Sequence, residues 1–496
     1  MPNRLKTTLL SAAITVAVSG CAVQPKAFTP DEQAAMTRED LQSMFEEQPP
    51  VVKPISLYEA MARAIRFNLD RRVQLMEEAL RIGQLEVAKG NLLPQLTVNA
   101  GYNARNNYPG SFDDSNNSLE PSTSQDKRYR TADATFTWNV LDFGVSYAQA
   151  RQEADNVLIA REKRRKVVQN IIQDVRYAYW RALSARKLLP ELDRILVEAD
   201  EALRKLDALQ RLSIESPLVY LRFRKQLLSL MRDMWTLRED LSTARAEFAA
   251  LINLRPGQSF ELLDPPGREV AIPSMELPIE RLEGYALIHR PDIREQHYKA
   301  RVSSEEIRKA MARMLPGVEL AVGGNFDSTS FLVNDTWSQL GVRVSWNIFN
   351  LFTGQKAVET AEAQHELDDA RRRSLQMAVM VQVHLAVQRF KVAQKNYRLA
   401  RQLNEVEQGI LVQTAASEQA EIQTELEVLS AKVAASLAKL AEDISYAELH
   451  NAYGRIQSSI GIDPLPASLE QNSLEYIAEL IEQREKTWQE TAVEGL

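Results

Sequence analysis

The strongest constraint on the fold is an internal duplication of the sequence. At a shift of 222 positions, Ala64 matches Ala286, Asn68-Leu69-Asp70 matches Arg290-Pro291-Asp292, and Leu93-Pro94 matches Leu315-Pro316. At a shift of 208 positions, Trp138-Asn139-Val140 matches Trp346-Asn347-Ile348. A repeat of this length means that both halves contain the same order of elements. We expect a helix, a Leu-Pro stop, two strands and long helices in each half, over residues 55–265 and 266–462.

Period-2 alternation predicts two strands in each half, at about 95–104 and 131–141, and at about 317–324 and 338–349. In the second of these, Phe136 and Trp138 alternate with Thr135 and Thr137, so one face is apolar and the other polar. A soluble sheet packed on helices would show the same pattern. The polar loops 106–130 and 325–336 favour membrane hairpins with exposed loops instead.

The remaining segments carry the heptad spacing of long antiparallel coiled coils. Apolar residues follow a 4-3 rhythm from Ile171 to Leu206, and the second half repeats it from Val379 to Ala400. Return helices are expected near 218–253 and 426–447. A helix over 145–209 would be about 98 Å long. Pro190 lies within it and is expected to kink or break it, because proline removes a backbone donor.

The N-terminus has the form of a lipoprotein signal peptide over residues 1–20. Arg4 and Lys6 precede a short apolar run, and Val18-Ser19-Gly20 then leads to Cys21, which is the single cysteine of the chain. The run is about half the length that a spanning helix needs. We expect cleavage before Cys21 and a lipid anchor on its thiol, and no other cofactor. An ordinary secretory signal with an incidental cysteine is the alternative.

Composition agrees with a helical chain and excludes several classes. One cysteine cannot form an internal disulfide or a thiolate metal site, and 18 glycines in 496 residues are too few for a turn-rich fold. The formal charge of −7 implies no attraction to nucleic acid. Residues 21–54 contain five prolines and are expected to form an extended linker. The tail, 463–496, has one amphipathic segment near Tyr476–Ile481, which either packs on the helices or is disordered.

No group of residues indicates catalysis or metal binding. The five histidines, at 289, 297, 365, 384 and 450, lack metal-ligand spacing, and the sequence has no HExxH or Walker A motif. Neighbouring carboxylates such as Glu305-Glu306 lie among basic residues in helical stretches, where surface ion pairing is the simpler explanation. We therefore expect no enzyme, no catalytic residue and no metal site.

Four strands are too few to close a barrel within one chain, since the smallest outer-membrane barrels have eight. Open edges in lipid would leave backbone N–H and C=O groups unsatisfied, at several kcal/mol each. The chain is therefore expected to form an oligomer. Trp138 and Trp346, near strand ends, fit an aromatic girdle at the membrane interface.

Several features of the sequence are informative together: the lipoprotein signal, the doubled hairpins, the strand ends W-N-V-L-D-F-G and W-N-I-F-N-L-F-T-G, the segment R-P-D-I-R-E-Q, and T-E-L-E-V-L near 424. In this combination the chain resembles the TolC-like outer-membrane efflux family. The resemblance covers roughly residues 50–462. It implies a homotrimer in which three chains share a 12-stranded β-barrel continued by a periplasmic α-barrel. It also implies a periplasmic adaptor protein and an inner-membrane transporter as partners, and location in the lipid of a Gram-negative outer membrane.

The same resemblance suggests functional residues at the periplasmic end. Glu427 and Ser430 occupy positions of family gate carboxylates, and Gln423 replaces the usual arginine of the gate. Ser213 and Glu421 replace the usual glycines of the tip turns. The candidates for adaptor contact at the two tips are Leu212, Ser213, Ile214, Glu421 and Ile422. For Glu427, a carboxylate on a solvated helix face is the alternative interpretation.

The resulting hypothesis is a passive outer-membrane exit duct for drugs or other small molecules, driven by its partners. A duct for secreted protein or polysaccharide is one alternative. A periplasmic coiled-coil structural lipoprotein, from a different class, is another.

Overall fold

The computed structural model describes residues 25–46, 48–111, 122–211, 217–264, 278–419, 425–464 and 472–491. The chain divides into two compact units, Met1–Val51 and Val52–Leu496. Each unit is described by itself.

The first unit contains a helix, α2 (Pro30–Phe45), where an extended linker was expected, so that expectation is wrong for these residues. Thr29 and Glu32 form a capping box, in which Glu32 N–H donates to Thr29 Oγ1 at 3.3 Å and Thr29 N–H donates to Glu32 Oε2 at 2.9 Å. Pro30 occupies the first helical position, where its fixed φ favours a helix and its missing N–H costs nothing. The proline that suggested an extended chain is therefore part of a helix start.

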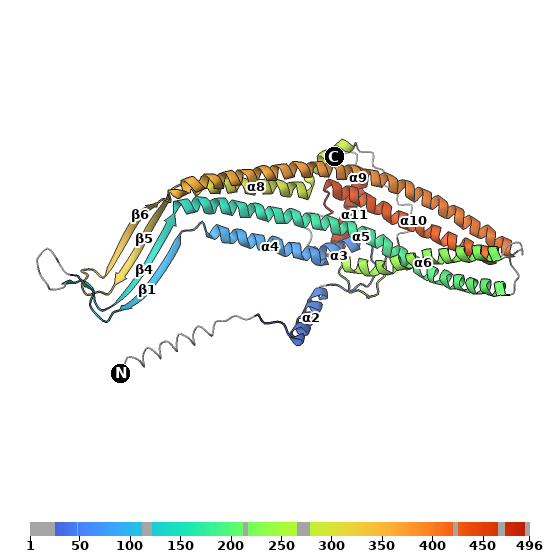
Figure 1. Cartoon of the computed structure of the whole chain (residues 1–496), viewed down its shortest axis with the longest axis horizontal. Coiled ribbons are helices and arrows are strands. Elements are labelled where there is room, and N and C mark those ends of the chain that lie inside the picture. Colours follow the sequence, from blue (N-terminus) through green and yellow to red (C-terminus); the bar gives the residue numbers. More distant parts are fainter. Residues whose placement is uncertain are drawn as a thin grey trace. The chain divides into compact units, whose positions relative to one another are not determined.

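The second unit repeats one order of elements twice, as the duplication predicts (Figure 1). The first half contains α3 (Leu57–Phe67), α4 (Leu69–Gly90), β1 (Gln95–Ala104), a small hairpin of β2 (Gly110–Ser111) and β3 (Ser122–Thr123), β4 (Arg128–Asn139), α5 (Val140–Arg211) and α6 (Pro217–Leu251). The second half contains α7 (Ile279–His289), α8 (Pro291–Ala312), β5 (Gly317–Asp327), β6 (Thr336–Ser345), α9 (Phe349–Gln419) and α10 (Glu425–Ile460), and α11 (Leu474–Thr491) follows.

The four long strands form one antiparallel sheet in the order β1-β4-β5-β6, so the hairpins of the two halves meet between β4 and β5. The register places Leu96, Phe136, Val322 and Leu340 in one row on one face. The next row, on the other face, is Thr97, Thr135, Gly323 and Gln339. The sheet therefore has an apolar face and a polar face, as the alternation predicts.

Two strands end earlier than expected, because an asparagine turns the chain into a helix. Asn139 Oδ1 accepts hydrogen bonds from the backbone N–H groups of Leu141 (3.1 Å) and Asp142 (3.3 Å). Asn347 Oδ1 accepts one from Phe349 N–H at 3.1 Å. This is helix N-capping. The repeated Trp-Asn pair thus marks the point where strand gives way to long helix.

The heptad seams form the core between the long helices. Val175, Ala182 and Ala199 of α5, and Val379 and Val383 of α9, are fully buried. Next to the sheet, α4, α5, α8 and α9 lie side by side in that order. Toward the helical turns, α6 packs on α5, and α10 packs on both α5 and α9 (Figure 1). Two short helices therefore follow one another along each long helix, as their summed lengths suggest.

Pro190 does not break α5, which runs for 72 residues with Pro190 inside it. The expected break is wrong. Pro190 lies on the exposed side of the helix. A backbone carbonyl that loses its helical donor on that side can be hydrated, and buried neighbours such as Leu188 and Leu192 continue the seam on either side of the proline.

The C-terminal tail contains the 18-residue helix α11, longer than the amphipathic segment seen in the sequence. Ile477 and Ile481 are buried, and α11 packs on α3. Glu485 also forms an ion pair with the buried Arg176 of α5, with 2.6 Å between Oε1 and Nη2. Apolar contact and a buried charge pair together dock the tail on the helices.

Among the described residues, no helix combines the length and the apolar character that a membrane span requires. The predicted fold class, long antiparallel helices with four strands from an internal duplication, is confirmed.

Candidate functional site

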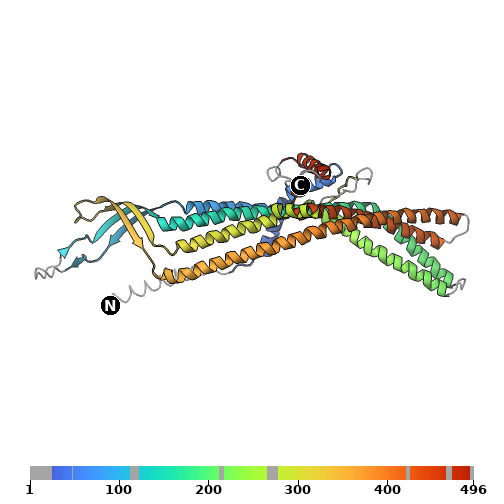
Figure 2. The same ribbon diagram turned by 90° about the horizontal axis from the view of Figure 1, so that it is seen from above.

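The helical hairpins α5–α6 and α9–α10 diverge toward their turns, as Figure 2 shows. The outgoing and returning helix of each hairpin pack closely, as α5 does with α6 and α9 with α10. Contact between α6 and α10 is sparse in comparison. The two hairpins are held together mainly where α10 packs on α5, and the space between α6 and α10 near the turns is more open.

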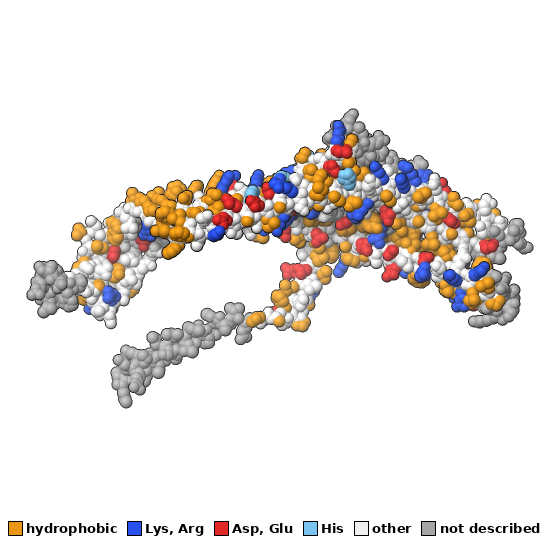
Figure 3. Space-filling model, turned by 45° about the horizontal axis from the view of Figure 1, so that its top comes forward, with side chains coloured by type: hydrophobic (Ala, Val, Ile, Leu, Met, Phe, Trp, Pro, Cys, Tyr) orange, Lys and Arg blue, Asp and Glu red, His pale blue; other side chains and the backbone are white. Residues whose placement is uncertain are grey.

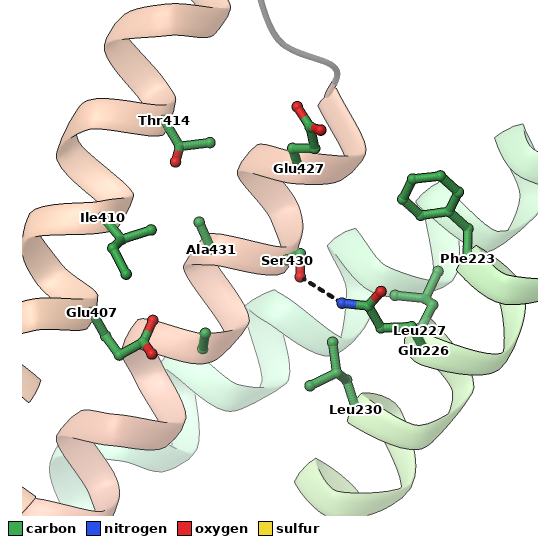
Figure 4. Close-up of a pocket in the computed structure, with 11 residues that line it drawn as sticks. Phe223, Gln226, Leu227, Leu230, Glu407, Ile410, Thr414, Glu427, Ser430 and Ala431 are labelled. Atoms are coloured by element: carbon green, nitrogen blue, oxygen red, sulfur yellow. Dashed lines mark hydrogen bonds between the residues drawn. The ribbon is translucent and has the colours of Figure 1, made fainter. Parts of the chain in front are cut away.

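A groove with a volume of about 410 Å³ lies in this space, between α6, α9 and α10 (Figure 4). Its apolar part comes from all three helices, and its polar groups lie along the rim. The lining residues are Phe223, Gln226, Leu227, Leu230, Glu407, Ile410, Thr414, Glu427, Ser430, Ala431 and Ala434.

One hydrogen bond crosses the groove between the hairpins. Gln226 Nε2 of α6 donates to Ser430 Oγ of α10 at 3.3 Å (Figure 4). Both groups are neutral, and the bond is exposed to water. A bond of this kind contributes about 0.5–1.5 kcal/mol at most. It is a weak link, which a modest force on either hairpin would break.

The groove carries two carboxylates, Glu407 on α9 and Glu427 on α10, and no lysine or arginine lines it. Two basic residues of α6 and α10, Arg224 and Lys432, form ion pairs with carboxylates of α5. Arg224 lies 3.2 Å from Asp207, and Lys432 lies 3.2 Å from Glu198. The rim facing the groove is therefore acidic.

The structure brings two of the predicted gate residues together and adds two that sequence reasoning missed. Glu427 and Ser430 line one groove, and Gln226 and Glu407 complete its polar rim. Gln226 lies on the return helix of the other half, and no motif singles it out. The other candidates lie outside the described residues: Cys21, Leu212, Ser213, Ile214, Glu421, Ile422 and Gln423.

Trp138 lies on the apolar face of β4, and Trp346 directly follows the end of β6, so both are at the end of the sheet where the strands meet the long helices. The Trp138 ring contacts Phe143 edge to face, with 5.9 Å between centroids, and Trp346 Nε1 donates to the Met314 carbonyl at 3.1 Å. Hydrophobic side chains gather at this junction in Figure 3. The position suits an interfacial girdle, and that role stays a prediction.

The model of the outer membrane efflux protein family matches residues 67–254 and 284–461. These two segments correspond to the two halves of the duplication. Among curated proteins, no sequence matches the chain.

Solved structures share the fold at low sequence identity. The outer-membrane channel OprN is 18% identical, with a TM-score of 0.65, over 82% of this chain and 89% of its own. The CmeC outer membrane channel of Campylobacter jejuni is 12% identical, with a TM-score of 0.65, over 93% and 97%. The outer membrane protein VceC of Vibrio cholerae is 14% identical, with a TM-score of 0.61, over 82% and 96%.

The family match spans both halves of the duplication, and the similar structures are outer-membrane channels with the same fold. The chain therefore belongs to the outer membrane efflux protein family, and it is an outer-membrane efflux channel rather than an enzyme.

Proposed function

We propose that this chain is the exit duct of a tripartite efflux system, through which small molecules pass passively from the periplasm to the exterior. The observation that carries the proposal is a sheet with an apolar and a polar face, continued at one end by helices far longer than a bilayer is thick. In a closed wall, the apolar face would meet lipid and the polar face would line water. An inner-membrane transporter would supply the energy, and a periplasmic adaptor protein would connect the duct to that transporter.

The duct is proposed to be a homotrimer. The sheet ends in two edge strands, β1 and β6, whose backbone groups need partners in lipid. Three copies would supply the 12 strands of one barrel. Exposed apolar residues also form a stripe along α9 that another copy would cover: Met377, Val381, Leu385, Val392, Leu399, Leu403, Val406 and Ile410.

The periplasmic end is proposed to be gated by the groove between the hairpins. Opening would move α9–α10 away from α5–α6. This motion would break the Gln226–Ser430 hydrogen bond, together with the Lys432–Glu198 and Ser436–Glu191 contacts between α10 and α5. Because neither Gln226 nor Ser430 is charged, this hydrogen bond (the latch) would respond little to salt or pH, whereas salt would screen the Lys432–Glu198 ion pair. Gln423, Ser213 and Glu421 would modify the gate and the adaptor contact at the turns.

A lipid on Cys21 is proposed to anchor the mature chain in the outer membrane. The signal sequence supports this, because the single cysteine follows the small residues at the expected cleavage point. The strands would cross the membrane, and the lipid would add a second point of attachment.

The experiment is conductance in planar lipid bilayers, using protein purified from the outer membrane of cells fed labelled palmitate. We expect ion-conducting channels that open rarely, and label that is lost in Cys21→Ser. In Ser430→Ala, loss of the latch is expected to raise the open probability by roughly threefold to tenfold. Ser242→Ala is the matched control, because Ser242 Oγ bonds within its own helix, to the Glu239 carbonyl at 2.7 Å.

Protein that inserts but never conducts would contradict the duct. Equal open probabilities in Ser430→Ala and Ser242→Ala would contradict the latch alone. Absence of label from the wild-type chain would contradict the lipid anchor and leave the channel standing.

A further inference from the structure

The polar face of the sheet carries a tryptophan that neither the girdle nor the gate uses. Trp337 of β6 pairs with Asn325 of β5, which in turn pairs with Asp133 of β4 and through it with Asn99 of β1. These four residues form one row across the sheet. Trp337 is 43% exposed, and it lies on the face opposite to Leu340 and Val342. A large exposed aromatic ring on the otherwise polar face calls for an explanation.

This row borders a hollow of about 530 Å³ on the sheet. Asp133, Asn325 and Trp337 are among its lining residues, together with Val98, Ala132, Ala134, Gly324, Phe326, Thr336 and Ser338. The residues around the hollow therefore include an aromatic residue, a carboxylate and an amide of one row.

The carboxylate is not neutralised by a described basic residue. Asp133 Oδ2 accepts hydrogen bonds from Asn99 Nδ2 at 2.9 Å and from Thr135 Oγ1 at 3.4 Å, both of which are neutral donors. A second carboxylate, Asp327, lies on this face two residues beyond Asn325 and accepts from Thr329 N–H at 2.9 Å. Neutral hydrogen bonds fix these carboxylates and leave their negative charge to attract a cation.

The spacing of the row suits one class of ligand. Adjacent strands lie about 4.8 Å apart, so Trp337 and Asp133, two strands apart, are separated by about 10 Å. Asn325 stands between them, and its buried Nδ2 has no hydrogen-bond acceptor among the described residues. A molecule that pairs an aromatic ring with an ammonium group a few ångströms away would span this distance, with the ring against Trp337 and the charge at Asp133.

We propose that Trp337, Asn325 and Asp133 form a binding site for small aromatic cations on the inner wall of the duct, which such molecules occupy in transit. The site rests on the proposed function, because a closed barrel would turn the polar face toward the lumen. Bound cations would narrow the path for ions, so occupancy is measurable as block of current.

The test is block of single-channel current by benzyltrimethylammonium in planar bilayers containing the full-length protein. We expect reversible block, and a concentration for half-block that rises roughly threefold to tenfold in Trp337→Ala and in Asp133→Asn. Trp337→Phe retains an aromatic ring and is expected to recover most of the affinity. Tyr102→Ala is the matched control, since Tyr102 is also an exposed aromatic residue, but it lies on the apolar face, three residues along β1 from Asn99.

Two further probes separate charge from ring. Tetramethylammonium, which lacks the ring, and benzenesulfonate, which carries the opposite charge, are both expected to block much more weakly. Equal half-block concentrations in wild type, Trp337→Ala and Asp133→Asn would overturn the site while leaving the channel proposal intact, as would equal block by the sulfonate. If Trp337→Ala yields no channels, Asp133→Asn decides. A wild-type protein without current would overturn the channel proposal and this site with it.

Discussion

His450 shows how the buried seam constrains a single ionisable side chain. It lies on α10 between aromatic rings, with centroids 4.9 Å from Trp180 and 4.5 Å from Tyr446. Burial, and then the positive charge of Arg176, lower the pKa of His450 from 6.5 to about 3. The imidazole is therefore neutral in the folded protein throughout the physiological pH range.

This lowered pKa predicts a pH dependence of stability. Below pH 6.5 the unfolded chain binds a proton at His450 and the folded chain does not. The contribution of neutral His450 to the free energy of unfolding is therefore complete above pH 6.5 and is lost as pH falls toward 3. At pH 4.5 the loss is about 3 kcal/mol. Thermal unfolding of wild type and His450→Phe between pH 7.5 and 4.5 measures this loss. Over this range the Tm of the wild type is expected to fall by more than the Tm of His450→Phe. Parallel decreases in the two proteins would refute this assignment.

For single residues, the periodicity of the sequence predicted which side chains are buried. It did not predict the pairs of side chains that only tertiary packing brings together. The heptad spacing identified Val175, Val379 and Val383 as core residues, and they are buried. Alternation likewise identified Trp138 as a residue of the apolar face. Gln226 was not identified, because its partner Ser430 is more than two hundred residues away and only the packing of the hairpins brings them together.

The long helices show that element boundaries depend on local capping as much as on pattern. Alternation continues through Trp346 and Ile348 in the sequence, yet β6 ends at Ser345. The Asn347 side chain accepts a hydrogen bond from the Phe349 N–H and caps the start of the helix. The start of α2 was present in the sequence as Thr29-Pro30-Asp31-Glu32, a capping box with proline in the first turn. It was missed because the number of prolines in this segment was interpreted as a sign of extended chain.

Pro190 and Pro217 differ in position and therefore in predicted effect. Pro190 lies inside α5 and leaves one carbonyl without its helical donor, whereas Pro217 opens α6, where proline is favoured. Pro190→Ala is expected to raise stability, by up to about 3 kcal/mol, and Pro217→Ala to leave it unchanged or slightly lower. Thermal unfolding followed by circular dichroism compares them. A lower Tm for Pro190→Ala would show that α5 requires the proline.

At the scale of the whole molecule, the duplication was the most informative feature of the sequence. It predicted two equivalent halves, four strands and paired long helices before any contact was known, and the sheet joins the halves through β4 and β5. It could not predict how the α5–α6 and α9–α10 hairpins diverge at their turns, because heptads specify which helices pack and not where packing stops. The acidic groove lies in that divergence.

In the proposed duct, one chain forms an incomplete wall, which closes only with other copies. The most direct measurement is the mass of the detergent-extracted outer-membrane protein under native conditions, together with its gel mobility before and after heating. We expect a trimer that heat converts to monomer. Cys21→Ser is expected to form the same trimer, because strand pairing rather than the lipid holds the copies together. A monomer at every protein concentration, or a protein released from the membrane by salt, would contradict the proposed duct.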